Sequence, residues 1–134
     1  MVFTPDENSF IREHRLAVVS TVKKDGGPQA TPVYYVYDGK KLFISVTAAR
    51  KKTVNVRRDP RVAVTVLAEE HPFKHVQVTG RAEITDDNLV DMSHRIWSTF
   101  REPPKDFAKL LADQGRVLMV VTPERATSNL TPSR

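Results

Sequence analysis

Segments in which apolar residues alternate with polar ones, or follow one another without a break, recur along the chain and are separated by turn-forming residues. The segments with this strand-like pattern are 15–22, 31–37, 41–46, 61–67, 75–84 and 116–121. Lys24 to Gly27 and Asp38-Gly39 are typical hairpin turns, which join consecutive strands in antiparallel order. The pattern therefore predicts about six strands, most of them paired antiparallel with their neighbours in sequence.

Helical patterns occupy the stretches between some of these strands. Thr4-Pro5-Asp6-Glu7 has the spacing of a capping box with proline at the first helical position, which predicts a short helix through about Glu13. Residues 48–58 lose the strand alternation and read as a second short helix, which Asp59-Pro60 ends because the residue before proline disfavours helix.

Two more helices are predicted before the last strand. Residues 85–87 are expected to cap a helix whose Leu89, Met92 and Ile96 form an apolar stripe, and a shorter helix follows Pro103-Pro104. From Thr122 onward the chain is rich in Pro, Ser and Thr, so this tail is expected to be irregular. The whole predicts one domain, 1–134, of the β-barrel (α+β) class with short flanking helices, because closure of a barrel removes exposed strand edges.

The charge of the chain is concentrated in one place. The 134 residues carry a net charge of +5, and the segment 50–61, RKKTVNVRRDPR, holds six basic residues and one acidic residue. The rest of the chain is balanced, so the entire excess lies in these twelve residues. Such a cluster suggests an anionic ligand, whereas a solvated basic helix face is the plainer interpretation.

Several classes of chemistry lack the residues they need. The chain has no cysteine, which excludes disulfides and thiolate sites and fits a reducing, cytoplasmic setting. Its five glycines form neither a dinucleotide-binding fingerprint nor a phosphate loop, and its four histidines lack metal-ligand spacing, so no metal is expected. No segment is long and apolar enough for a membrane span, and no serine has the setting of a hydrolytic nucleophile. A bound cofactor that carries the reaction itself is compatible with this inventory.

The basic segment and one strand together suggest where such a cofactor binds. A helix that begins near Arg50 would add free N–H groups and its dipole to the charges of Arg50, Lys51 and Lys52, which favours a bound phosphate. Pro32 lies inside a predicted strand, where it removes a ladder donor and implies an edge or a bulge. The nearby tyrosines offer flat surfaces for a ring system, although tyrosines in strands more often serve packing.

Three runs of residues, in their order, resemble the pyridoxamine 5'-phosphate oxidase-like split-barrel superfamily. They are RLAVVSTVKKDGGPQATPVYY from Arg15, RKKTVNVRRDPRVAV from Arg50 and VQVTGRAEI from Val76. Within that superfamily, the short length and the run from Lys52 to Arg61 are most similar to flavin/deazaflavin oxidoreductases, which use coenzyme F-420 or FMN. The resemblance implies an antiparallel split barrel and a homodimer with the cofactor at the subunit interface.

The resemblance also implies a set of cofactor-binding residues. The cofactor ring would lie along Pro32, Val33, Tyr34 and Tyr35 and along Ser45, Val46 and Thr47, and its phosphate would bind Arg50, Lys51 and Lys52. Arg57 and Arg58 would serve an acidic cofactor tail. Where flavin oxidases of the superfamily carry a glutamine, this chain has His75, with Gln77 as a possible substitute. Where the oxidase branch has a substrate-binding segment with tryptophan and arginine, this chain reads Thr127-Ser128-Asn129-Leu130-Thr131-Pro132, which argues against pyridoxamine phosphate oxidation.

These observations leave three functions open. The first is an oxidoreductase that passes hydride from coenzyme F-420, or alternatively uses FMN, to a small organic acceptor without a dedicated catalytic acid. The second is a protein that binds or sequesters the cofactor without catalysis. The third, nucleic-acid binding through residues 50–61, has only the run of charge in its favour, because interleaved aromatic residues are missing. Neither nucleic acid nor membrane is therefore expected as a partner.

Overall fold

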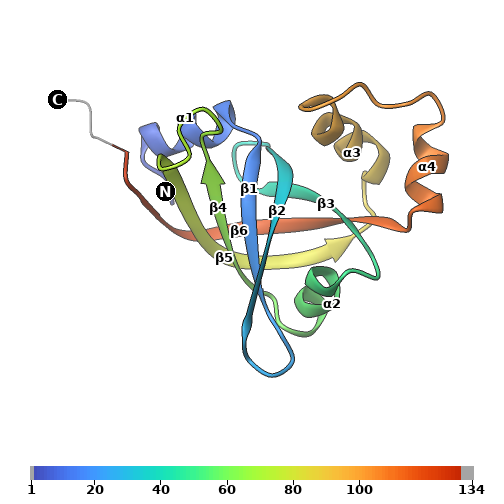
Figure 1. Cartoon of the computed structure of the whole chain (residues 1–134), viewed down its shortest axis with the longest axis horizontal. Helices are drawn as coiled ribbons and strands as arrows, with labels where there is room; N and C mark the ends of the chain where they lie inside the picture. Colours follow the sequence, from blue (N-terminus) through green and yellow to red (C-terminus); the bar gives the residue numbers. More distant parts are fainter. Residues whose placement is uncertain (1, 131–134) are drawn as a thin grey trace.

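Six antiparallel strands close into a barrel in the computed structural model, which describes residues 2–130 (Figure 1). The strands are β1 (Leu16–Val22), β2 (Pro28–Tyr37), β3 (Leu42–Thr47), β4 (Arg61–Leu67), β5 (His75–Thr85) and β6 (Arg116–Ser128). Their order around the barrel is β1-β2-β3-β6-β5-β4, so the last strand is placed between β3 and β5. The predicted barrel class, strand number and hairpin order are confirmed.

Alternation along each strand fills the barrel interior. One face of every strand is apolar, and together these faces form the principal core, which includes Ala17, Val19, Val33, Tyr35, Ile44, Val46, Val64, Val66, Val78 and Met119. Burying a side chain of this size contributes roughly 1.5–3 kcal/mol, so the interior is the main source of stability. The opposite face of each strand points outward, either to solvent or to a helix.

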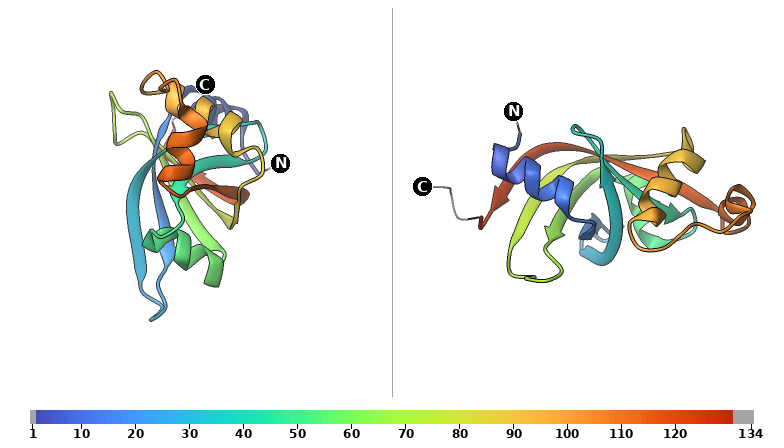
Figure 2. Two further views of the ribbon diagram at one scale, coloured as in Figure 1. Left: turned by 90° about the vertical axis from the view of Figure 1, so that its right-hand side faces the viewer. Right: turned by 90° about the horizontal axis from the view of Figure 1, so that it is seen from above.

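Four helices flank the barrel (Figure 2). They are α1 (Pro5–Glu13), α2 (Lys51–Arg58), α3 (Leu89–Ser98) and α4 (Phe107–Asp113). The capping box of α1 is present, since Thr4 accepts a bond from the Glu7 N–H and Glu7 accepts one from the Thr4 N–H. None of the described helices has the length and apolar character needed to span a bilayer.

The apolar stripe of α3 packs on the outer face of the barrel, as its spacing predicted. Met92 and Ile96 contact Leu118 and Val120 of β6, with residues of β2 and β3 alongside. The predicted cap at residues 85–87 is wrong, because the N-cap is Asn88, in the left-handed region with φ 57° and with no side-chain capping bond. Asparagine tolerates that conformation better than most residues, and it redirects the chain from β5 into α3.

The irregular tail predicted from Thr122 is also wrong, since β6 continues as strand to Ser128. Its second half pairs with β5 from Val76 to Thr79, and a register shift between Thr79 and Gly80 accommodates Pro123 opposite Gly80. Pro123 and Glu124 disfavour an isolated strand here, but the exposed edge of β5 offers a full ladder of hydrogen-bonding groups. Tertiary pairing therefore overrides local composition.

We expect Gly80→Ala to destabilise the barrel at this bulge. A Cβ at residue 80 would collide with the backbone carbonyl of Thr122, and a backbone obstacle cannot rotate away as a side chain can. Overpacking of this kind costs about 1–3 kcal/mol, which should lower the midpoint of urea unfolding. Thr79→Ala, at the exposed neighbouring residue, is the control and should change stability much less. Equal stability of Gly80→Ala and the native chain would contradict this packing.

Candidate functional site

Strands β2 and β3 pair along only part of their length. Their ladder covers Tyr35–Tyr37 of β2 against Leu42–Ile44 of β3, whereas β2 pairs with β1 along its whole length from Pro28 to Tyr34. On the N-terminal side of Tyr35, from residue 34 back to residue 28, β2 therefore separates from β3. This edge of β2 has no strand beside it. We call this opening, between residues 28–34 of β2 and residues 45–47 of β3, the split.

Backbone groups of β2 point into the split. The Tyr35 N–H donates to the Arg15 carbonyl on the β1 side at 3.0 Å. Because backbone groups alternate in direction along a strand, the N–H and C=O of Tyr34 and the C=O of Pro32 point away from β1, toward the split. Pro32 has no N–H to leave unpaired at this position, which is why a proline is tolerated here.

The residues expected to contact a cofactor ring divide between the two faces of their strands. The side chains of Val33, Tyr35 and Val46 are buried in the barrel interior, so only their backbone atoms are available to an external ligand. Tyr35 is fully committed, because its hydroxyl donates to the Ile11 carbonyl at 2.7 Å. Burial raises the pKa of this phenol far above its usual value, which keeps it neutral.

The outward-facing members of the set are Pro32, Tyr34, Ser45 and Thr47. Tyr34 is not free, since its ring stacks on Phe100 with centroids 4.3 Å apart. Ser45 differs, because its Oγ is buried yet has no hydrogen-bond partner among the described residues. A buried hydroxyl left without a partner costs free energy, and a ligand that gained access to this atom would supply the missing bond. The hydroxyls of Thr31, on β2, and Ser93, on α3, are buried without a partner in the same way.

Helix α2 begins beside the open end of the split and is tied there by buried contacts. Asn55 donates from Nδ2 to Thr21 Oγ1 and to Gln29 Oε1, each at 3.1 Å, which joins the helix to β1 and β2. Thr53 Oγ1 donates to the Thr47 carbonyl at 2.8 Å, which joins it to the end of β3. The helix therefore bridges the two strands where they have separated.

The N-terminus of α2 presents unsatisfied donors. Arg50 is the N-cap, as the sequence predicted for the helix start, but its side chain makes no capping bond. Within residues 2–130 the N–H groups of Lys51 and Lys52 have no acceptor, whereas those of Thr53 and Val54 donate to the Arg50 carbonyl. Free N–H groups and the helix dipole together favour an anion at this point.

Three cations gather at this helix start without a carboxylate beside them. Arg116, at the beginning of β6, lies opposite Thr47 in the β3–β6 ladder and joins Arg50 and Lys52. Burial lowers the pKa of Lys52, and the charges of Arg50 and Arg116 lower it further. Burial and the Arg50 charge likewise lower the pKa of Arg116. Among the described residues, none of the three forms an ion pair.

Arg116 escaped the sequence reasoning, because it is 64 residues from Lys52 and precedes an ordinary apolar strand. Only the closure of β6 against β3 brings it to the helix start. Its guanidinium carbon also lies 5.9 Å from the centre of the Trp97 ring, and its Nε donates to Gln114 at 3.0 Å. These contacts hold the Arg116 guanidinium in place beside Arg50 and Lys52, and we call these three residues the cluster.

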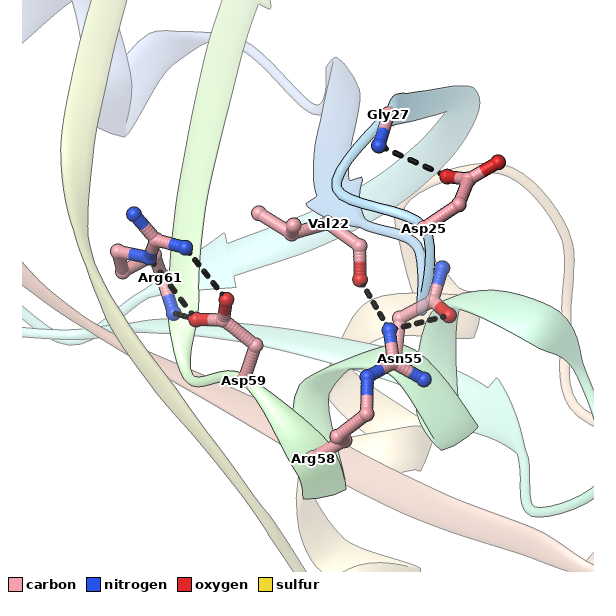
Figure 3. Close-up of polar contacts among 7 residues, drawn as sticks. All are labelled: Val22, Asp25, Gly27, Asn55, Arg58, Asp59 and Arg61. Carbon is pink, nitrogen blue, oxygen red and sulfur yellow. Dashed lines mark hydrogen bonds and ion pairs between the residues drawn. The ribbon is translucent and has the colours of Figure 1, made fainter.

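The other basic residues of segment 50–61 have different surroundings (Figure 3). Arg58 donates to the Val22 carbonyl and to Asn55 Oδ1, and Arg61 pairs with Asp59 at 2.7 Å. Arg58 therefore ties α2 to the end of β1, and Arg61 holds the turn between α2 and β4. Both side chains are engaged within the chain. Arg57 is exposed in the last turn of α2, about 9 Å along the helix axis from Lys51, and does not join the cluster.

His75 and Gln77 lie at the other end of the barrel from the cation cluster. His75 pairs with Leu67 and Gln77 with Thr65, near the start of β1, whereas α2 contacts the end of β1 at Thr21. The backbone N–H of His75 donates to Asn129 Oδ1 at 2.9 Å, and its ring Nδ1 lies 2.8 Å from the Phe73 carbonyl. Within one chain these two residues are not brought to the site.

The residues at the split fit a ring-bearing phosphate ester. Three cations and two free N–H groups suit a phosphate, and a charge-assisted bond is roughly twice as strong as a neutral one. The split, which lies beside this cluster, offers backbone groups and the unpartnered Ser45 hydroxyl to a planar polar ring. Residues 2–130 contain no group of three histidine, aspartate or glutamate side chains placed to hold a metal ion.

Comparison with known proteins gives a consistent result. A sequence model of the pyridoxamine 5'-phosphate oxidase family matches residues 3–129. Among solved structures, an F420 reductase is 26% identical, with 93% of this chain and 98% of that chain covered and a TM-score of 0.76. A conserved hypothetical protein from Mycobacterium tuberculosis is 27% identical, with coverages of 100% and 92% and a TM-score of 0.77.

The same fold also occurs in a protein with a different role. The haem storage protein of Vibrio cholerae is 17% identical to this chain, with coverages of 96% and 95% and a TM-score of 0.74. At that identity the likeness concerns the fold alone, and function must be argued from the site.

We expect Lys52→Met and Arg116→Met each to weaken the binding of FMN by about tenfold or more, because each removes a charged phosphate donor. Binding of riboflavin, which has the same ring without the phosphate, should change little in either variant. Lys74→Met removes an exposed lysine from the β4–β5 loop and is the matched control. Fluorescence titration of the flavin measures all of these affinities. Equal losses for FMN and riboflavin would show that the cluster does not act on the phosphate.

Proposed function

Because this chain belongs to the pyridoxamine 5'-phosphate oxidase family, whose members bind flavins, we propose that it is an oxidoreductase that uses coenzyme F-420. In this proposal reduced F-420 passes hydride to a small organic acceptor. The observation that carries the proposal is the gathering of Arg50, Lys52 and Arg116, without carboxylate partners in residues 2–130, at the N-terminus of α2 beside the split. The likeness to an F420 reductase along nearly the full length of both chains supports the same cofactor.

Positive charge favours F-420 over FMN as the cofactor. Both carry a phosphate, but F-420 adds a glutamate tail with further negative charges. The cluster leaves three cations without carboxylate partners in the described part of the chain, and the exposed Lys51 and Arg57 add two further cations on α2. FMN remains the alternative, because one phosphate satisfies the same donors.

The chain's own part in the reaction would be binding, orientation and exclusion of water. A bound deazaflavin supplies the hydride chemistry, so the protein needs no nucleophile of its own. Arg50, Lys52 and Arg116 would hold the phosphate, while the backbone of Pro32 and Tyr34 and the Ser45 hydroxyl would orient the ring. The stacking of Tyr34 on Phe100 would hold the edge of β2 against the segment that follows α3.

A single observation favours the second function, that of a protein that only binds the cofactor. Within residues 2–130 no carboxylate forms an ion pair with the cluster. His75 and Gln77, the two residues that stand for the glutamine of the flavin oxidases, lie at the other end of the barrel. A single chain therefore brings no proton donor of those types to the split. Reaction of the bound cofactor with an acceptor separates the two functions.

Titration of the purified chain with F-420 and with FMN tests the proposal. We expect saturable binding of F-420 with an affinity greater than that of FMN, and at least tenfold weaker binding of the deazaflavin ring without its phosphate-bearing side chain. Reduced F-420 is then mixed with the protein and a panel of enones, and its absorbance is followed. Binding of neither cofactor would overturn the proposal. Tight binding without accelerated oxidation by any acceptor would favour the binding-only function.

The site also needs a second chain in this proposal. The cavity of about 640 Å³ is lined by residues other than those of the cluster and the split, and the cavity of about 400 Å³ includes only Pro28 of the split, so in this proposal a second chain encloses the ring. A homodimer that covers the split would exclude water and bring His75 or Gln77 of the partner subunit nearer the ring. Sedimentation equilibrium at micromolar concentration should give twice the chain mass of 15.2 kDa. A monomer that binds the cofactor with full affinity would contradict this part of the proposal.

A further inference from the structure

A separate cavity lies at the other end of β2, among α1, the β2–β3 turn and β6. Its volume is about 640 Å³, within the range of small-molecule sites. Tyr37, at the end of β2, lines it, whereas α2 contacts β2 at Gln29. Roughly 25 Å of strand separates these two residues, so the cavity is distinct from the split.

Aromatic and apolar side chains form much of its wall. The rings of Phe3 and Tyr37 meet edge to face, with centroids 6.0 Å apart and an interplanar angle of 85°, and Pro123 of β6 contributes a further apolar surface. The Tyr37 hydroxyl donates to Asn8 Oδ1 at 2.8 Å and lies 2.9 Å from the Gly39 carbonyl oxygen. The polar end of Tyr37 is therefore satisfied, and its ring is held rigidly.

Arg12 is positioned at this cavity by contacts on two sides. Its guanidinium carbon lies 5.3 Å from the centre of the Tyr37 ring. Its Nη2 lies 2.7 Å from the place where a Cβ of residue 39 would be, so a side chain there would push the end of Arg12 aside. Gly39 also has a φ of 99°, which suits the turn. The same glycine thus shapes the hairpin and admits the guanidinium.

The charge of this cavity is uncompensated. Arg12 and Lys40 both line it, and neither forms an ion pair with a carboxylate in residues 2–130. The neighbouring Asp38 is engaged by the turn itself, since its Oδ1 accepts from the N–H groups of Lys40 and Lys41 at 2.8 and 2.7 Å. An apolar wall with a guanidinium beside the Tyr37 ring and a second cation matches an amphipathic anion.

We propose that this cavity binds a small organic anion, with its aromatic or aliphatic body against Phe3, Tyr37 and Pro123 and its carboxylate on Arg12. Lys40 adds charge at the exposed rim. The apolar contacts supply affinity, and the guanidinium selects the carboxylate over its neutral analogues. The inference stands on this cavity alone and is independent of the cofactor bound at the split.

Calorimetric titration with 2-naphthoate tests the proposal, with 2-naphthamide as the neutral ligand of nearly equal shape. We expect saturable binding of the carboxylate, about fivefold weaker binding of the amide, and a similar loss for the carboxylate in Arg12→Gln and in Lys40→Gln. Lys24→Met, in the exposed β1–β2 turn, should keep the native affinity. Amide resonances of Phe3, Asn8 and Gly39 should shift in nuclear magnetic resonance spectra as 2-naphthoate is added.

Four results would overturn the proposal. They are the absence of saturable binding up to the solubility limit, equal affinities for the acid and the amide, full affinity in both Arg12→Gln and Lys40→Gln, and resonance shifts confined to residues 50–53. Self-association that displaces 2-naphthoate would also overturn it, since the cavity would then be an interface between two copies of the chain.

Discussion

The separation of β2 from β3 over residues 28–34 is the constraint on which the rest of the site depends. A closed barrel satisfies its backbone through continuous ladders, and here one ladder stops after three residue pairs. The groups left over on β2 need another partner, since unpaired backbone donors and acceptors are costly when they are buried. Helix α2 bridges the two strands through Asn55 and Thr53, but these bonds reach no backbone group of β2. A ligand laid along this edge would supply the missing partners.

The same geometry explains why so much charge is tolerated at the start of α2. Basic residues are unfavourable near a helix N-terminus, where the dipole is positive, and three cations close together repel one another. Burial of Lys52 and Arg116 adds a desolvation cost, seen in the lowered pKa of each. Arg58 and Arg61, only a few residues away, are instead matched by a carbonyl, an amide and a carboxylate. A cluster left unmatched beside matched neighbours is the basis of our proposal that an anion completes the site.

Much of the fold could be predicted because its signals are local. The capping box at Thr4, the Asp38-Gly39 turn and the alternation of Val62, Val64 and Val66 each depend on a few neighbouring residues, and each appears in the structure as expected. The failures came where distant strands decided the outcome. The second half of β6 is a strand because β5 lies beside it, and α3 begins at Asn88 because the exit from β5 needs a left-handed residue.

The sequence by itself determined the class of the barrel and the position of the helix start at Arg50, with Lys51 and Lys52 behind it, because periodicity and runs of charge are properties of adjacent residues. Only the tertiary structure decided which residues share the site. Closure of β6 against β3 brings in Arg116, the pleat turns Val33, Tyr35 and Val46 inward, and the length of the barrel keeps His75 and Gln77 away. Strand register and barrel closure join residues that are far apart in the chain, and the pairing that sets them is absent from any short stretch of sequence.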